Sequence, residues 1–219
     1  IWKDASTLWA TFDLNGLAPG TFDMQVTEGG ITTTKAAAYT VTSEPAGNLE
    51  FQLITSTVRP GGSGQVIIAY KNAGDTDVPA PLFVLTADGA LLQEVGQSGF
   101  SGSTIEFLGT NSSGPAGILT PGFSGQIVIT FQPTIGSGLV NFTLSTSSSL
   151  PASIDWSVAK DLMKNPYVGQ DAWDAIFTNF TTIVGSSTEQ YVAALDGIAT
   201  YLDQLGEPTA DITSLVQYA

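Results

Sequence analysis

The sequence lacks histidine and cysteine altogether among its 219 residues. Without histidine the chain has no side chain of the type that most often acts as general base, and it also lacks the commonest metal ligand. Without cysteine it can form neither a disulfide bond nor a reactive thiolate. Any catalysis would depend on carboxylates, and we therefore expect that the protein is not an enzyme.

Basic residues are scarce as well, because six Lys and Arg stand against 20 Asp and Glu and give a formal net charge of −14. Such a surface repels a phosphate backbone, so nucleic acid is not expected as a partner. No apolar run approaches the roughly 20 residues that span a bilayer, and we expect no membrane-spanning segment. The chain begins at Ile1 rather than at Met, which we interpret as the mark of a processed product or, preferably, of a fragment.

What the chain does contain is a turn-plus-strand unit that occurs twice. Residues 58–70 and 119–131 agree almost position for position, each with a Pro-Gly pair followed by a β-branched and aromatic run. Proline presets φ and glycine accepts a positive φ, so the pair predicts a type II turn that leads into a strand. A looser copy occupies residues 17–22. Repeated turns and short strands of this kind are typical of antiparallel β-sandwiches.

Residues 48–150 contain enough short strands for a complete sandwich. Apolar alternation and turn residues predict seven strands in about a hundred residues, which is the size of an immunoglobulin-like domain. The predicted strands are 49–53, 65–71, 81–86, 90–95, 104–108, 126–132 and 139–145.

Residues 1–47 also show strand patterns. Alternating apolar residues predict strands at 8–14, 22–26 and 34–41, with a turn at Gly29-Gly30. Three strands cannot close a sandwich, so they either complete a truncated immunoglobulin-like domain or pack onto the domain at 48–150. The segment 43–47 is expected to link the two domains.

The hydrophobic period changes from 2 to about 3.6 near residue 150, which predicts a helical subdomain at 151–219. Ser153 or Asp155 is expected to cap a first short helix, and residues 173–184 form a strongly amphipathic second helix. Ser187 and Gln190 have the spacing of a capping box.

The apolar spacing after Gln190 predicts which face of the third helix is buried. That face should carry Tyr191, Leu195, Ile198, Leu202 and Leu205. Asp211 is expected to cap a last short helix. The helices should form a small bundle packed on an end of the sandwich or on a neighbouring domain.

Few residues suggest a binding site. Asp75 and Asp77 follow Asn72 and Gly74 in a loop, and oxygen ligands with this spacing can hold Ca²⁺, although the EF-hand pattern is not met and a solvated turn is the favoured explanation. Trp9 could present a flat ring to a sugar. Arg59, which is the only arginine, stands in the turn before a strand and should fix a nearby carboxylate or loop carbonyls. No cofactor other than calcium is indicated.

Two further alternatives remain open at this stage. A carboxylate hydrolase would need two acids that face each other across a concave site. A spontaneous Lys–Asn isopeptide crosslink would use Lys35 or Lys71 on a strand beside a buried acid.

Residues 58–81, Val-Arg-Pro-Gly followed by Val-Ile-Ile-Ala-Tyr-Lys-Asn-Ala-Gly-Asp-Thr-Asp-Val-Pro-Ala-Pro, resemble the CARDB-like group of bacterial immunoglobulin-like modules. The shared pattern is a Pro-Gly turn, a hydrophobic strand, an Asn-x-Gly turn and a proline-flanked strand, and it covers about residues 48–145. The first 42 residues resemble the closing strands of another such module. The helical tail is similar to segments that come after these modules in very large repeat-containing surface proteins.

The resemblance implies an extracellular or cell-surface location and a role in adhesion or as a spacer, with no shared catalytic residues. We therefore expect a non-catalytic structural module of a large bacterial surface protein, which acts as a spacer or as an assembly unit of a filament. Its partners would be neighbouring domains or like subunits, since incomplete sheets can exchange strands. The alternative is a carbohydrate- or calcium-dependent binding module.

Overall fold

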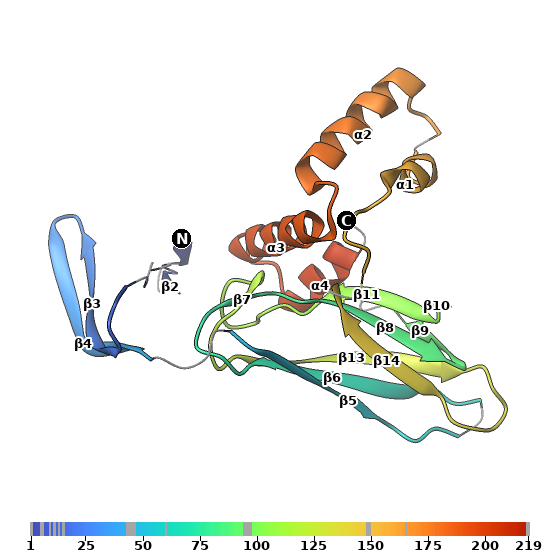
Figure 1. The fold of residues 1–219 in the computed structure, drawn as a ribbon, viewed down its shortest axis with the longest axis horizontal. Coiled ribbons are helices and arrows are strands. Elements are labelled where there is room, and N and C mark those ends of the chain that lie inside the picture. Colours follow the sequence, from blue (N-terminus) through green and yellow to red (C-terminus); the bar gives the residue numbers. More distant parts are fainter. Residues whose placement is uncertain are drawn as a thin grey trace.

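The computed structural model describes residues 2–217, with gaps at 5–6, 9, 11, 13, 15, 43–46, 60, 94–97, 148–149 and 165. The structure is mainly antiparallel β, and its helices come after the strands in the sequence (Figure 1). This confirms the mainly β class and the change from strands to helices that the hydrophobic period predicted. None of the helices in the described part of the chain is long and apolar enough to cross a bilayer.

A five-stranded sheet forms one layer, and the two copies of the repeated unit lie at its centre. The strands of the two copies, β6 (Gly64–Asn72) and β13 (Ser124–Pro133), pair antiparallel with each other. The order is β10-β9-β13-β6-β5, in which β5 is Leu49–Thr55, β9 is Ala90–Gln93 and β10 is Phe100–Gly102.

The pairing of the two copies is reciprocal. Gly64 lies opposite Phe131, and its counterpart Gly125 lies opposite Tyr70. A Cβ built on Gly64 would stand 2.8 Å from Cζ of Phe131, and one built on Gly125 would stand 2.8 Å from Cζ of Tyr70. Each copy therefore supplies the glycine that leaves room for the aromatic ring of the other copy.

The turn of the second copy has the geometry that its Pro-Gly pair predicts. Gly122 has φ +75°, and the amide of Phe123 donates to the carbonyl of Thr120 at 3.0 Å. In the first copy, Gly61 has φ +78° and the amide of Gly62 donates to the carbonyl of Arg59 at 3.0 Å. The positive φ at the third position of each turn is the reason that glycine occupies it.

A three-stranded sheet forms the second layer, in the order β11-β8-β14. The two sheets are joined along one side, because β8 ends at Asp88 and the chain turns at Gly89, with φ +88°, into β9 of the other sheet. The chain crosses back from the five-stranded sheet to the three-stranded sheet between β10 and β11. The bounds are Leu82–Asp88 for β8, Thr104–Leu108 for β11 and Asn141–Thr146 for β14.

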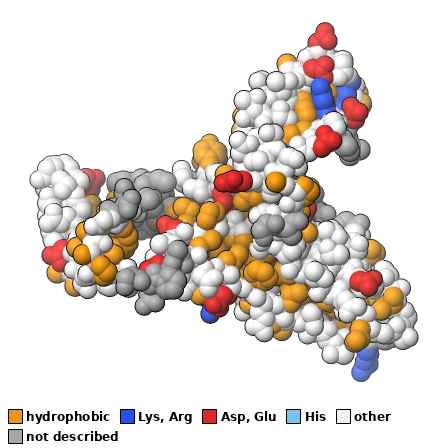
Figure 2. Space-filling view, viewed as in Figure 1, with side chains coloured by type: hydrophobic (Ala, Val, Ile, Leu, Met, Phe, Trp, Pro, Cys, Tyr) orange, Lys and Arg blue, Asp and Glu red, His pale blue; other side chains and the backbone are white. Residues whose placement is uncertain are grey.

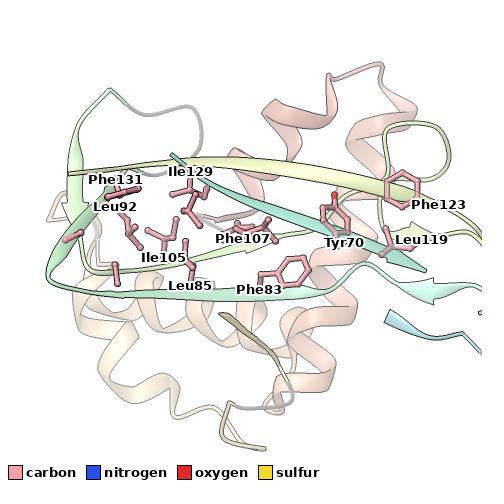
Figure 3. Packing of buried hydrophobic residues seen from close by; sticks show 14 residues of the cluster. Tyr70, Phe83, Leu85, Leu92, Ile105, Phe107, Leu119, Phe123, Ile129 and Phe131 are labelled. Carbon is pink, nitrogen blue, oxygen red and sulfur yellow. The ribbon is translucent and has the colours of Figure 1, made fainter. Parts of the chain in front are cut away.

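The two sheets enclose the main hydrophobic core (Figure 3). Each large apolar side chain that is fully buried contributes about 1.5–3 kcal/mol to stability, so this core dominates the energetics of the fold. Its buried members are Val66, Ile68, Tyr70, Phe83, Leu85, Ala87, Ala90, Leu92, Ile105, Phe107, Leu119, Phe123, Ile129 and Phe131. We call β5 to β14 the two-sheet body; it contains all seven strands predicted for residues 48–150 and a short pair, β7 (Val78–Pro79) with β12 (Ile118–Leu119).

The N-terminal part is a separate hairpin of β3 (Gly20–Glu28) and β4 (Ile31–Val41). The predicted strands 22–26 and 34–41 lie inside these strands, and the turn has positive φ at Gly29 and Gly30. The predicted strand 8–14 is wrong for its described residues beyond Leu8, where the pair β1 (Trp2–Asp4) and β2 (Thr7–Leu8) ends.

Four helices come after the two-sheet body, and most of their predicted ends are confirmed. Asp155 rather than Ser153 caps α1, since it accepts a hydrogen bond from the amide of Ser157 at 2.9 Å. The capping box of Ser187 and Gln190 is formed. The prediction for Asp211 is wrong, because this residue lies in the first turn of α4. The helices are α1 (Trp156–Leu162), α2 (Gln170–Val184), α3 (Thr188–Gln204) and α4 (Thr209–Gln217).

A second hydrophobic core attaches α3 and α4 to the two-sheet body. Leu195 and Ala199 of α3 and Ile212 of α4 are buried together with Ala80, Leu82, Leu108 and Ala116 of the body. The predicted buried face of α3 is partly wrong, because Leu205 is 61% exposed. The helix is oriented so that Ala199 faces the sheets. Gly117 of the body permits this close approach, because a Cβ added there would come within 2.2 Å of the Asp196 carbonyl oxygen.

Candidate functional site

The loops at one end of the two-sheet body are organised by Asn72, whose side chain is 1% exposed. Its Nδ2 donates to the carbonyls of Thr76 at 2.7 Å and Leu119 at 2.9 Å. Its Oδ1 accepts from the amides of Gly74 at 3.0 Å and Asn48 at 3.2 Å. One amide group therefore ties together the start of β5, the β6–β7 turn and β12, and its hydrogen bonds are used for the fold.

Asp75 and Asp77 lie on this turn. Asp75 is partly buried, and its Oδ2 accepts a hydrogen bond from Oγ1 of Thr42 at 3.2 Å, while its buried Oδ1 has no hydrogen-bond partner among the described residues. Burial raises the pKa of Asp77 above its ordinary value. Within the described residues, no three side chains of the metal-binding types come together. A calcium ion here would therefore have to rely on these two carboxylates and on backbone carbonyls.

The other predicted site residues do not converge on this turn. Trp9 lies outside the described residues. Arg59 is exposed, and no described side chain forms an ion pair with its guanidinium, so the carboxylate partner expected for it is not found in this part of the chain. Lys71 is also exposed and forms an ion pair with Glu50 at 2.9 Å on the surface of the sheet, which gives no support to a buried crosslink.

The helical tryptophans Trp156 and Trp173 have packing roles. The ring nitrogen of Trp156 donates to the carbonyl of Gly185 at 2.8 Å, and its ring packs edge-on against Phe180. The ring nitrogen of Trp173 donates to the carbonyl of Lys160 at 3.0 Å, and the side chain is buried. Neither ring is a free platform for a sugar.

A mainly apolar cleft of about 810 Å³ lies between α3 and the two-sheet body. One of its polar lining residues is Asp196 of α3, whose Oδ1 is buried and makes no hydrogen bond with any described residue. Burial raises the pKa of this carboxyl to about 8, so at neutral pH it is mostly protonated. The cleft is lined by Leu49, Pro79, Ala80, Pro81, Thr146, Ser147, Leu150, Ala152, Ser187, Thr188, Glu189, Val192, Ala193 and Asp196.

A second hollow, of about 360 Å³, lies at the far end of the same side of the body, where β5 and β14 form the outer strands of their sheets. It is lined by apolar side chains that include Val58, Val140 and Phe142, and by Arg59. Between the two hollows the inward-facing ring of Phe51 on β5 remains 42% exposed. We call this side, between β5 and β14, the open side.

The arrangement favours binding by shape and by strand edges over acid–base chemistry. Asp196 and Tyr70 serve separate purposes: Asp196 lines the cleft, whereas Tyr70 donates to the carbonyl of Thr110 at 2.6 Å inside the core, where burial raises its pKa. The sequence analysis predicted neither the cleft nor the open side. One indication of the open side was present in the sequence: no strand pattern follows residue 145, so no later strand was expected to cover the edge of the last one.

The chain was compared with models of protein families, with curated proteins and with solved structures. None of these matches it.

Proposed function

We propose that the chain is a non-catalytic assembly and adhesion module of a large bacterial protein at the cell surface or outside the cell. In this proposal the two-sheet body is an immunoglobulin-like sandwich of the CARDB-like kind, which its repeated Pro-Gly turns and strand patterns favour. Its partners are neighbouring domains of the same chain or like subunits.

The observation that carries the proposal is the pair of cores. The core between the sheets and the core under α3 and α4 unite the sheets and both helices into one rigid unit. The buried polar side chains Asn72 and Asn111 bond to backbone groups of the surrounding loops, so they support the fold. A rigid body whose polar groups hold its own loops is suited to mechanical work and to presenting a surface.

The path of the chain favours an assembly unit over a spacer. The chain comes into the body at Leu49 and leaves β14 at Thr146, and both residues line the cleft beside α3. The two attachment points therefore lie at the same end of the body. A body connected in this way would add little to the length of a stalk. Its far end and its open side would project away from the axis of the stalk.

Sedimentation velocity on the purified chain tests this function. We expect the sedimentation coefficient to rise with protein concentration between roughly 1 and 200 µM, the range in which an association with micromolar Kd becomes visible. A sedimentation coefficient that stays at the monomer value over this range would overturn the assembly role.

Calcium binding is the second candidate. It is favoured by the buried Oδ1 of Asp75, which has no hydrogen-bond partner among the described residues and which a bound cation would satisfy. Thermal unfolding with 5 mM calcium, taken here as roughly ten times the weak Kd of extracellular modules, should raise the midpoint relative to EDTA. The Asp75→Asn/Asp77→Asn variant should lose this difference. Identical midpoints of the parent chain in calcium and EDTA would remove the candidate.

A further inference from the structure

The open side of the two-sheet body is the place where the smaller sheet lacks strands that would cover the larger one. The five-stranded sheet ends at β5, whereas the opposing sheet has only three strands and ends at β14. The apolar face of β5 is therefore incompletely covered: the ring of Phe51 packs edge-on against Phe83 but is 42% exposed. No described strand pairs with the outer edge of β14, and an unpaired strand edge of this kind is a template for another strand.

Apolar side chains line the open side along most of β14. Phe142 and Leu144 of β14 pack against the main core while remaining only partly buried, as do Leu49 and Leu53 of β5. The hollow beside Phe142 lies at the start of β14, and the cleft beside Thr146 lies at its end. An extended segment laid along β14 would cover these side chains and gain backbone hydrogen bonds at the same time.

The same chain carries a hairpin that needs a partner. Phe22, Met24 and Val26 alternate along β3, and Val26 is exposed. Hydrophobic side chains gather on the hairpin, which stands apart from the body (Figures 1 and 2). The first two line a small hollow of about 190 Å³ together with Tyr39 on β4 and with Phe12, Leu14 and Leu17 of the preceding segment, which cover part of this face. A two-stranded hairpin is at best marginally stable in water, and the exposed Val26 lies outside this hollow, so this end of the face favours a further packing surface.

We propose that β3 of a second copy of this chain pairs antiparallel with the outer edge of β14. This inference rests on the proposed assembly function and names its partner. Two apolar pairs form when Met24 lies opposite Leu144 and Val26 opposite Phe142, and Phe22 then lies opposite Thr146. Because β4 accompanies β3, the three-stranded sheet would gain two strands and equal the five strands of the opposing sheet.

Charge supports this direction and register. In the antiparallel alignment the end of β3 at Glu28 reaches Val140, and the hollow that Val140 lines also contains Arg59. Arg59 is exposed and no described side chain forms an ion pair with it. The single arginine of the chain would then find its carboxylate on the second copy.

The linker favours a second copy over the hairpin of the same chain. Oγ1 of Thr42 donates to Oδ2 of Asp75 at 3.2 Å, and the amide of Gly47 donates to Oγ1 of Thr76 at 2.6 Å. These bonds fasten both ends of the linker to the β6–β7 turn, and the hairpin stands to one side of the two-sheet body (Figure 1). The hairpin is thus positioned to reach a neighbouring molecule.

Cysteine crosslinking tests the pairing directly, because the chain has no cysteine of its own. In the proposed register the exposed residues Gln25 and Thr143 are opposite each other. An equimolar mixture of Gln25→Cys and Thr143→Cys chains should form a disulfide-linked heterodimer on mild oxidation. Thr86→Cys is the matched control, since Thr86 is exposed on the same sheet and pairs with Thr143, but lies one strand farther from the edge; it should not crosslink to Gln25→Cys.

A charge exchange provides the second readout. Glu28→Arg and Arg59→Glu should each weaken self-association roughly two- to five-fold, and mixing the two variants should restore it, as measured by sedimentation equilibrium. Circular dichroism checks that each variant remains folded.

The outcomes separate this inference from the proposed function. Association without a Gln25–Thr143 crosslink would overturn the pairing but keep the assembly role. A monomeric disulfide in the Gln25→Cys/Thr143→Cys double variant at low concentration would show that the hairpin folds onto its own chain and would overturn the second-copy proposal. A chain that remains monomeric at all concentrations would overturn both.

Discussion

The glycine under the ring of Tyr70 offers the sharpest test of how the two-sheet body is built. In a Gly125→Ala variant the new Cβ would stand 2.8 Å from both Cζ and Oη of Tyr70 and 3.0 Å from Cζ of Phe123. Neither ring can move freely, because Tyr70 is buried and donates to the carbonyl of Thr110 at 2.6 Å. The added methyl group must displace the Tyr70 ring or separate β6 from β13.

The expected loss has two contributions. Overpacking a close-packed core by one methyl group costs about 1–3 kcal/mol. Losing the hydrogen bond of the Tyr70 hydroxyl costs about 1 kcal/mol more. We therefore expect Gly125→Ala to lower the free energy of unfolding by about 2–4 kcal/mol, measured by urea denaturation monitored by far-UV circular dichroism.

Two further variants decide whether the steric explanation is right. Gly136→Ala is the matched control, because a Cβ there would meet nothing within 4 Å, and it should change stability by less than about 0.5 kcal/mol. Tyr70→Leu should cost much less in the Gly125→Ala background than in the parent chain, a coupling of at least about 1 kcal/mol. If Gly125→Ala is as stable as the parent, or if the two substitutions are additive, the reciprocal packing of glycine and ring does not hold the sheet together.

Three other predictions concern single side chains of the body and of α3. Burial raises the pKa of Asp196 in the folded chain to about 8, which is above its value in the unfolded chain. Because the unfolded chain loses this proton at a lower pH, the free energy of unfolding should fall as the pH rises from about 4 to 8. Asp196→Asn should remove most of this slope in urea denaturation series and raise stability at pH 7 by at most about 4 kcal/mol; an unchanged slope would mean that the carboxyl is solvated. Gly197→Ala lies on the exposed side of α3 with open space around it, and should raise the free energy of unfolding by about 0.5–1 kcal/mol. Asn72→Ala leaves the carbonyls of Thr76 and Leu119 without this donor and should cost about 2–4 kcal/mol, whereas Asn72→Asp should be worse at pH 7 than at pH 4 because its charge would face those carbonyls.

Local chemistry made the turns and caps of this chain predictable. A Pro-Gly pair has few low-energy conformations, and Gly122 adopts the one that the pair predicts. The capping box of Ser187 and Gln190 depends on residues only three positions apart, and it forms as expected. Strand patterns in residues 48–150 were equally readable, since short alternating runs bounded by glycine leave little choice.

Long-range packing was not predictable from the same patterns. The orientation of α3 depends on Gly117, which is far away in the sequence and where an added Cβ would stand within 2.2 Å of the carbonyl oxygen of Asp196 and 2.6 Å from Oγ1 of Thr200. The apolar residues of α3 alone favoured a face that included Leu205, which the structure leaves exposed. The site residues were hard to place for a similar reason: the turn around Arg59 predicted that it fixes a nearby carboxylate or loop carbonyls, and only the arrangement of β5 and β14 shows which surface it borders.

The continuous ribbon that turns at Gly89 has a mechanical consequence for the body. Because β8 runs into β9, and β10 into β11, the two sheets share covalent chain along that side and cannot part there without breaking the ribbon. If the two sheets separate, they should rotate apart about the Gly89 side and open between β5 and β14. Amide hydrogen exchange should therefore be slowest in the strands next to Gly89 and fastest in β5 and β14. A strand from another molecule would then bind at the part of the body that opens most easily.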